Sequence, residues 1–261
     1  LFRSKVSIWW KNKNAKSSFT AYNQAEGSFS TANQDLVKDV MVAAAPLKSG
    51  GDYKNGVPLT FRHTLSQVVV KAYNAAADNG ITIKVKAARL RNIGSTSTLS
   101  LPAAGSDTSD ELGYNPWAVP SVTSDFSNYD ATAEATTLST ATVAVLNTQV
   151  MIPQTLACNS DQFASGEGAY LSLLINVQET TTVDGEEQTS QIYPDTDGNA
   201  TVTTTYAWAA VNLDGYEWEP GKKYTITLKF AKDGYGSVDA EQTDGKTPAK
   251  DGKNSGDPIV D

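Results

Sequence analysis

The sequence predicts an all-β protein made of antiparallel sheets packed face to face. Apolar and polar residues alternate with a period of two in several runs, among them residues 81–87, 171–177 and 224–230. One apolar and one polar face per strand is the pattern of antiparallel sheets that share a core. Turn dipeptides such as Asp184-Gly185 separate the runs. Short strands with turns at this spacing are typical of β-sandwiches.

The first part of the chain contains one ambiguous segment and two expected strands. Residues 33–45 have some helical spacing, but their β-branched residues also suit a strand. Residues 61–65 and 81–87 alternate and are expected to be strands. We expect a first core that contains the apolar residues Phe61, Leu65, Val68 and Val70.

A stretch with little alternation follows these strands. Residues 102–127 contain three prolines and are interpreted as a long connection between two domains. We place the boundary near residue 118. The prediction is therefore an N-terminal β-sandwich domain of residues 1–117 and a C-terminal β-sandwich domain of residues 118–261.

The second part of the chain returns to the two-residue period. Strands are expected in residues 171–177, 202–208 and 224–230, and Asp184-Gly185 supplies the positive φ angles of a two-residue hairpin. Further reversals are expected at Asp197-Gly198, Asp214-Gly215 and Pro220-Gly221. We expect a second core that contains Leu173, Ile175, Tyr224, Ile226 and Leu228.

The C-terminal tail differs from both halves. Residues 232–261 are rich in Gly, Asp and Lys and poor in large apolar residues until Pro258, Ile259 and Val260. We expect a mobile polar linker that leads to one more strand. An apolar pair after such a linker is consistent with a strand that leaves its own domain and pairs elsewhere.

Composition excludes several classes of function. The chain has 261 residues and a formal net charge of −8, which disfavours binding to nucleic acid or to an anionic membrane surface. Cys158 is the one cysteine, so no intrachain disulfide is possible, and a lone cysteine is usually a small buried hydrophobe. No apolar run reaches the roughly 20 residues that span a bilayer. The sequence lacks an initiator Met and a signal peptide, so we expect a processed piece of a longer protein.

His63 is the one side chain that suggests catalysis. It falls on the apolar face of the expected strand, where we expect a hydrogen-bonded core histidine. A Ser–His–Asp triad would need His63 as its base, but the sequence has no Gly-x-Ser-x-Gly elbow to supply the nucleophile. Ser66 would face the opposite side of the sheet. We therefore predict no catalytic residues, and a Cys/His zinc site has too few ligands because His63 is the only histidine.

Acidic and glycine-rich segments do not provide a site either. Residues 195–199 resemble a calcium loop superficially, but their glycine is in the fourth position and not the sixth, so a hairpin turn is favoured. The carboxylate pair Glu186-Glu187 would point to opposite faces of a strand, as would Asp110-Glu111. No glycine-rich segment has the strand–loop–helix context of a phosphate site. We predict no metal and no cofactor.

The five tryptophans leave one alternative open. Trp117 and the other four could form a platform that stacks on sugars, but Trp208 and Trp218 suit strand positions and are expected to pack in the core. Trp9 and Trp10 are adjacent, so one of the two rings must face outward on a strand. A glycan-binding surface protein is therefore the alternative interpretation.

Three segments of the chain carry short motifs. Residues 57–66 are Val-Pro-Leu-Thr-Phe-Arg-His-Thr-Leu-Ser, downstream of Asp-Val-Met-Val-Ala at 39–43. Residues 150–155 are Val-Met-Ile-Pro-Gln-Thr, and residues 218–225 are Trp-Glu-Pro-Gly-Lys-Lys-Tyr-Thr. These segments resemble the L-x-F-x-H-x-L-S, hydrophobic-Ile-Pro-Gln-Thr and W-x-P-G-K-x-Y segments of the fimbrillin-like (Mfa-like) surface proteins of Bacteroides-type bacteria. Their order and spacing make the combination specific.

The resemblance implies two transthyretin-like β-sandwich domains and export to the cell surface as a lipoprotein. It also implies a stalk, tip or anchor subunit of type V pili, joined to its neighbours by exchange of a terminal β-strand. Family members usually have further sequence at both ends. We therefore expect the first domain to be N-terminally incomplete and the native chain to continue past Asp261.

The resulting hypothesis is a non-enzymatic structural or adhesive subunit of a bacterial surface pilus. Its partners are other pilin subunits, with a receptor or glycan on a host or bacterial surface as a further partner. The membrane is involved only through a lipid anchor on a removed N-terminal segment. Strand exchange is assigned to Pro258, Ile259 and Val260. The alternative is a glycan-binding surface lipoprotein that uses exposed aromatic rings.

Overall fold

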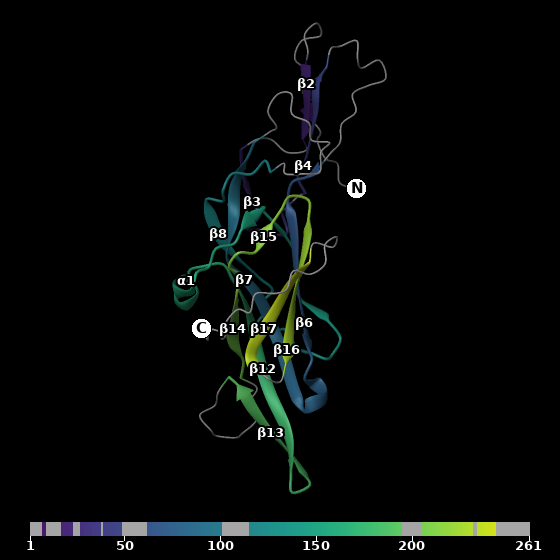
Figure 1. Cartoon of the computed structure of the whole chain (residues 1–261), viewed down its shortest axis with the longest axis vertical. Helices are drawn as coiled ribbons and strands as arrows, with labels where there is room; N and C mark the ends of the chain where they lie inside the picture. The colour runs from purple at the N-terminus through teal and green to yellow at the C-terminus, as the bar shows by residue number, and fades with distance from the viewer. Residues whose placement is uncertain are drawn as a thin grey trace.

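The structure is a computed structural model that describes residues 7–8, 17–22, 27–37, 39–48, 62–100, 115–194, 205–231 and 234–243. These residues form an elongated body made almost entirely of β-strands (Figure 1). The one α-helix among them, α1 (Ser160–Ser165), is capped at its start by Asn159. No helix in the described part of the chain is long and apolar enough to cross a membrane.

The larger sheet has seven strands and contains the longest strands of the molecule. Its main path is β13–β12–β7–β3, with β14 beside β12 and with β8 and β9 beside β7. All of these pairs are antiparallel, as the sequence predicts. The strands are β3 (Gly27–Ser30), β7 (Ile81–Leu99), β8 (Val122–Ser127), β9 (Thr136–Thr137), β12 (Tyr170–Val183), β13 (Glu186–Tyr193) and β14 (Ala207–Asn212).

The second sheet has four strands in the order β10–β6–β16–β17. Its central pair, β6 with β16, is parallel, whereas its other pairs are antiparallel. Parallel neighbours need a long crossover connection, and β6 and β16 are far apart in the sequence. The strands are β6 (Ser66–Asn74), β10 (Val143–Met151), β16 (Lys223–Ala231) and β17 (Gly234–Thr243).

Strand β17 overturns part of the prediction for the tail. Residues 232–261 were expected to be a polar linker, but residues 234–243 pair with β16 along most of its length. Backbone hydrogen bonds form a ladder without apolar side chains, so a polar composition does not exclude an edge strand. The remaining tail, from residue 244, lies outside the described residues.

Two smaller sheets complete the fold. The N-terminal sheet runs β1–β2–β4–β5, and the strands β2 and β4 lie at one end of the long axis (Figure 1). Within the ambiguous segment 33–45, residues from Met41 onward are strand and not helix. The strands of these sheets are β1 (Ser7–Ile8), β2 (Ser17–Tyr22), β4 (Met41–Lys48) and β5 (Arg62–His63), and β11 (Gln154–Thr155) with β15 (Glu217–Trp218).

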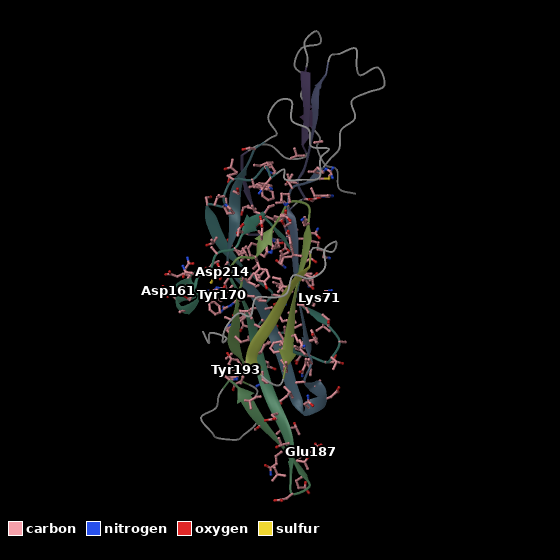
Figure 2. The ribbon with its side chains drawn as sticks, viewed as in Figure 1. Lys71, Asp161, Tyr170, Glu187, Tyr193 and Asp214 are labelled. Carbon is pink, nitrogen blue, oxygen red and sulfur yellow. The ribbon has the colours of Figure 1, made fainter. Side chains whose placement is uncertain are left out.

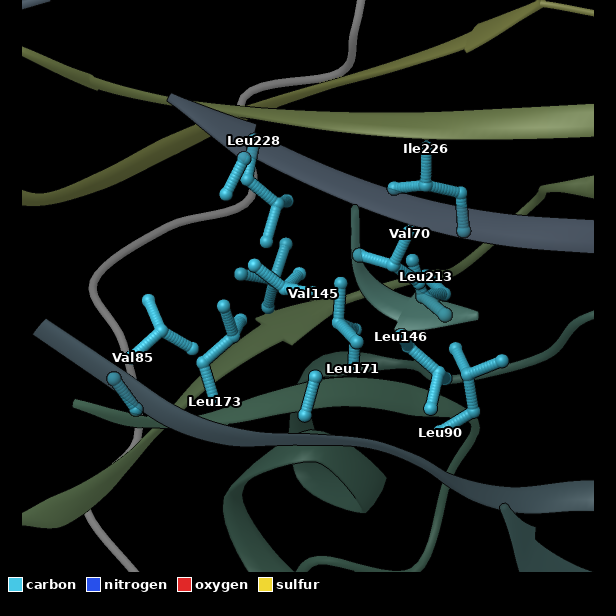
Figure 3. Close-up of a cluster of buried hydrophobic side chains, with 14 of the residues drawn as sticks. Val70, Val85, Leu90, Val145, Leu146, Leu171, Leu173, Leu213, Ile226 and Leu228 are labelled. Carbon is cyan, nitrogen blue, oxygen red and sulfur yellow. The ribbon is translucent and has the colours of Figure 1, made fainter. Parts of the chain in front are cut away.

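One large core lies between the two main sheets (Figure 3). Alternate residues of each strand point into it, which confirms the two-residue period as the signal for a sandwich. The strands β6 and β16 contribute from one sheet, and the strands β7, β12 and β14 from the other. Its members include Val68, Val70, Ile81, Ile83, Val85, Leu90, Leu171, Leu173, Ile175, Val211, Tyr224, Ile226 and Leu228.

Two residues assigned to the first core share this one with all five residues assigned to the second. Val68 and Val70 lie in the same cluster as Leu173 and Ile226. Strands that precede residue 118 pair with strands that follow it in both main sheets, as β7 does with β12 and β6 with β16. In the described part of the chain, a boundary near residue 118 therefore does not separate two cores. Alternation identifies which face is buried but not which strands share a core.

A second, smaller cluster lies beside the main core. It contains Leu65, which was expected in the first core, and Trp117 from the predicted connection. The Trp117 Nε1–H donates to the backbone O of Thr64 at 2.7 Å, and its ring lies 5.2 Å from that of Phe29. Phe61 lies outside the described residues. The other members of the cluster are Val40, Leu99 and Ile152.

The predicted long connection is in part a strand. Residues 122–127 form β8, which pairs with β7, and Phe126 is buried in the main core. The remaining side chains of β8 are exposed or half-buried. A strand with a single buried side chain shows almost no alternation of apolar residues. The three prolines nearby therefore led to the prediction of a connection.

Candidate functional site

The candidate site is the free edge of the four-stranded sheet. In the four-stranded sheet the outer strands are β10 and β17, and neither pairs on its outer side with another described strand. The outer strand of a sheet presents unpaired N–H and C=O groups, which form a template for another chain. An added strand would extend the sheet by main-chain hydrogen bonds.

The two edges are not equivalent. The ladder between β10 and β6 has two register shifts, at Ala144/Leu146 and at Leu146/Gln149. Bulges of this kind increase twist and blunt an edge against further pairing. The ladder between β16 and β17 is continuous from Thr225↔Thr243 to Lys229↔Asp239 and has one register shift, at Lys229/Ala231 near its end. Strand β17 is therefore the more regular edge for an incoming strand.

The sequence-assigned strand-exchange residues have no described position. Pro258, Ile259 and Val260 lie outside the described residues, as do Trp9, Trp10 and residues 195–199. The assignment of strand exchange to these three residues therefore stays a prediction.

His63 is on the surface and not in the core, which corrects the prediction. Its side chain is 60% exposed, and its Nδ1 lies 2.6 Å from Oδ2 of Asp39. The strand β5 has only two residues, and the chain bends at Leu65, which is buried instead. Alternation along a strand this short does not determine a buried face.

The His63–Asp39 pair has the geometry of two members of a triad, so the neighbouring hydroxyls matter. Thr64 Oγ1 donates to the backbone O of Val40 at 2.9 Å, and Ser66 Oγ donates to the backbone O of Glu219 at 2.8 Å. Both residues are buried. These two hydroxyls are directed at backbone carbonyls and not at the imidazole of His63, so neither serves as its nucleophile.

Cys158 is a fully buried residue, as a lone cysteine was expected to be. Burial raises the pKa of its thiol, and the nearby Asp214 carboxylate raises it further. The thiolate is the reactive form, so this cysteine is poorly suited to chemistry. Among the residues that the structure describes, no group of three or more Cys, His, Asp or Glu side chains is arranged to hold a metal ion.

The hairpin at Asp184-Gly185 has the predicted form. The two residues have φ angles of 53° and 87°, and Val183 pairs with Glu186 across the turn. Glu186 and Glu187 are exposed on β13, as expected of charges near a turn. The hairpin forms the far end of the molecule from β2 and β4 (Figure 1).

The tryptophans divide between core and surface. Trp218 is buried in the main core, as predicted, and Trp117 is buried in the smaller cluster. Trp208 was also expected in the core but lies half-buried on the outer face of the large sheet. The guanidinium of Arg89 stacks 3.8 Å from the centre of its ring. The inward positions of β14 are occupied by Ala209 and Val211 instead.

Tyr129 adds an exposed ring to the outer face near Trp208. Its side chain is 53% exposed, and the centres of the two rings lie 6.1 Å apart. Asn128 anchors the loop, since its Oδ1 accepts from Ala88 N and its Nδ2 donates to Val145 O. Hydrogen bonds from Thr132 lower the pKa of the Asp130 carboxyl. Sequence reasoning missed Tyr129 because it lies outside any periodic run.

Comparison with known protein families gives one match that spans nearly the whole chain. The sequence model of a family described as fimbrillin-like matches residues 2–245. A search of curated proteins found no match.

Solved structures give distant likenesses. A candidate cell adhesion protein from Bacteroides uniformis has 13% identity and a TM-score of 0.41, over 91% of this chain and 73% of that one. A fimbrial protein from Bacteroides vulgatus has 15% identity and a TM-score of 0.43, over 92% of this chain and 72% of that one. At these values the likenesses add nothing to the family match.

Proposed function

Because the chain belongs to the fimbrillin-like family, we propose that it is a structural subunit of a bacterial fimbria that joins its neighbours by β-strand exchange. The observation that carries the proposal is the family match over residues 2–245. A fimbrial subunit works at the cell surface and assembles with other pilin subunits. Its role is mechanical, and the family suggests a non-enzyme.

The proposed mechanism is β-augmentation at the edge of the four-stranded sheet. A strand from a neighbouring subunit would pair with β17, whose ladder to β16 is continuous from Thr225↔Thr243 to Lys229↔Asp239. The backbone then supplies affinity, and alternate side chains fix the register. We propose that the donor strand begins at Pro258, Ile259 and Val260. A lipid anchor on an N-terminal segment would hold the first subunit to the outer membrane.

The test compares the protein isolated from cells with a version that ends at Asp261, on unheated, non-reducing gels. Strand exchange predicts a ladder of bands for the native protein and its loss in the shortened one. In the native protein, Ile259→Asp with Val260→Asp should also remove the ladder. The matched control, Asn254→Asp with Ser255→Asp, places the same charges in the polar tail and should leave it intact. Equal ladders from all four proteins would exclude this donor strand.

The alternative function, glycan binding, is favoured by one observation. Tyr129 is exposed beside Trp208, and the cations Lys86 and Arg89 lie on the same face. Aromatic rings stack on the C–H faces of sugars, and flanking charges bond their hydroxyls. A polysaccharide array should lose its signal with Tyr129→Ala and keep it with Tyr73→Ala. No binding by the unaltered protein would exclude this alternative.

A further inference from the structure

The edge strand β10 has the composition of a strand that pairs readily with other chains. Residues 143–151 read Val-Ala-Val-Leu-Asn-Thr-Gln-Val-Met and contain no charged residue and no proline. The one charged side chain of the β10–β6 ladder, Lys71 (Figure 2), lies on the inner strand β6 opposite Ala144. Edges without charge or proline are templates for pairing. The register shifts blunt the middle of β10, but residues 149–151 pair with β6 without interruption, so this end needs another protection.

A side-chain amide occupies the backbone groups of Val150 at this end of the edge. The Oε1 of Gln34 accepts from Val150 N at 2.7 Å, and its Nε2 donates to Val150 O at 2.9 Å. Gln67, which lies opposite Val150 in the ladder, directs its own N–H away to Lys222 O. A primary amide has the acceptor and the donor of a peptide group. Gln34 therefore takes the place that a residue of a neighbouring strand would occupy beside Val150.

Two further amides bind carbonyl groups at the register shifts of β10. Asn128 Nδ2 donates to Val145 O at 2.8 Å, and Gln149 Nε2 donates to Asn147 O at 2.9 Å. Val145 and Asn147 fall within the two shifts and have no partner residue on β6. Amide side chains thus bind backbone groups at three points along this edge, from residue 145 to residue 150.

Two of these amides reach β10 from the other sheet. The loop that carries Gln34 begins at Thr31, whose N and Oγ1 donate to Ser95 O on β7 at 2.8 and 3.3 Å. The Nε2 of Gln34 donates back to Thr31 O at 2.8 Å. Asn128 Oδ1 accepts from Ala88 N, also on β7, at 2.8 Å. Both amides are therefore anchored to the large sheet, and both cover the edge of the small one.

We propose that the side-chain amides of Gln34, Asn128 and Gln149 guard the β10 edge against pairing with β10 of a second copy of this chain. Without this amide guard, two identical uncharged edges would pair antiparallel about a two-fold axis, in a closed dimer. The inference rests on the proposed strand exchange for its consequence, because a guarded β10 leaves incoming donor strands to β17. Growth from one edge only keeps a fimbria linear.

The experiment measures self-association of residues 1–261 by sedimentation velocity. Gln34→Met removes the amide and keeps the length of the side chain. The control, Gln67→Met, makes the same exchange at an exposed position of β6 opposite Val150, where strands flank the backbone on both sides. Urea titration of each variant verifies that it is folded.

The amide guard predicts that Gln34→Met dimerises with an association constant at least about tenfold above that of the unaltered chain and of the control. Adding Thr148→Lys to Gln34→Met should abolish the dimer, because a lysine on an edge strand opposes pairing between edges. The Val150 amide of Gln34→Met should exchange its hydrogen more slowly as the protein concentration rises. A purely structural role of Gln34 would lower stability in urea without producing a dimer.

Three results would overturn the amide guard. They are no increase in association of Gln34→Met, an equal increase in Gln67→Met, or a dimer that Thr148→Lys leaves unchanged. The gel ladders of the native protein report strand exchange independently. Intact ladders with a monomeric Gln34→Met chain would contradict the guard alone, and a dimeric Gln34→Met chain without native ladders would contradict strand exchange alone.

Discussion

The two halves of strand β12 have opposite environments although one continuous strand forms both. Residues from Tyr170 to Gln178 are buried, flanked by β7 on one side and by β14 and β13 on the other. From Thr181 to Val183 the strand is exposed and pairs, among described strands, with β13 alone. The first half builds the body, and the second half only extends it. Stability therefore resides in the body, and the tip contributes little to it.

The largest difference should appear on truncating side chains in the two halves. Leu173→Ala removes a side chain that is 1% exposed in the main core, and should lower the free energy of unfolding by about 2 to 5 kcal/mol. Thr181→Ala, eight residues further along the same strand, should change it by less than about 0.5 kcal/mol. Urea titration measures both. Similar losses at the two positions would mean that the tip contributes to the core after all.

Two glycines extend the comparison of body and tip to the backbone conformation. Gly80 has a φ of 80°, and a Cβ there would lie 2.4 Å from the backbone O of Thr180, so Gly80→Ala should cost about 3 kcal/mol. Gly185 has a φ of 87° but open space around it, so Gly185→Ala should cost about 1 kcal/mol of backbone strain. Unfolding titrations that rank the two in the reverse order would contradict the described packing of Gly80.

The pH dependence of stability should also be a property of the body. Burial raises the pKa of the Tyr216 hydroxyl, which packs against the main core. The unfolded state then loses this proton first as pH rises, so stability should fall above about pH 10, the ordinary tyrosine pKa. Tyr216→Phe should flatten that decline. An unchanged alkaline decline in the variant would assign the effect to other groups.

Thiol labelling should perturb the protein least and should distinguish the body from the tip most clearly, by the accessibility of a thiol in each. Cys158 is buried with a raised thiol pKa, so a thiol reagent should modify it only on unfolding. Thr182→Cys places a second thiol on the exposed tip, where labelling should be immediate in the folded protein. Rapid labelling of Cys158 in the unaltered protein would show that the body opens far more readily than its packing indicates.

Some of this architecture could be predicted from sequence because its causes are local. The alternation in residues 171–177 and 224–230 identified core faces, and Asp184-Gly185 identified a hairpin. Both signals depend only on residues that are close together in the sequence. The parallel pairing of β6 with β16 could not be predicted, because alternation indicates which face of a strand is buried and not which strand it pairs with.

The errors have the same origin. Trp208 was assigned to the core on alternation, but small residues fill its strand's inward positions and Arg89 stacks on the ring outside. His63 was assigned to a core on a strand that is two residues long. Strand β17 was taken for linker because edge pairing needs only the backbone. Each of these three environments depends on contacts with residues that are distant in sequence.

The most direct test of the central claim, that this chain is a structural subunit of a fimbria, is immunogold electron microscopy of cells that produce it. Antibodies raised against the chain should place gold particles along the length of surface filaments, and deletion of the chain should remove or shorten those filaments. Gold confined to the cell body, with unlabelled filaments that persist after deletion, would contradict the claim.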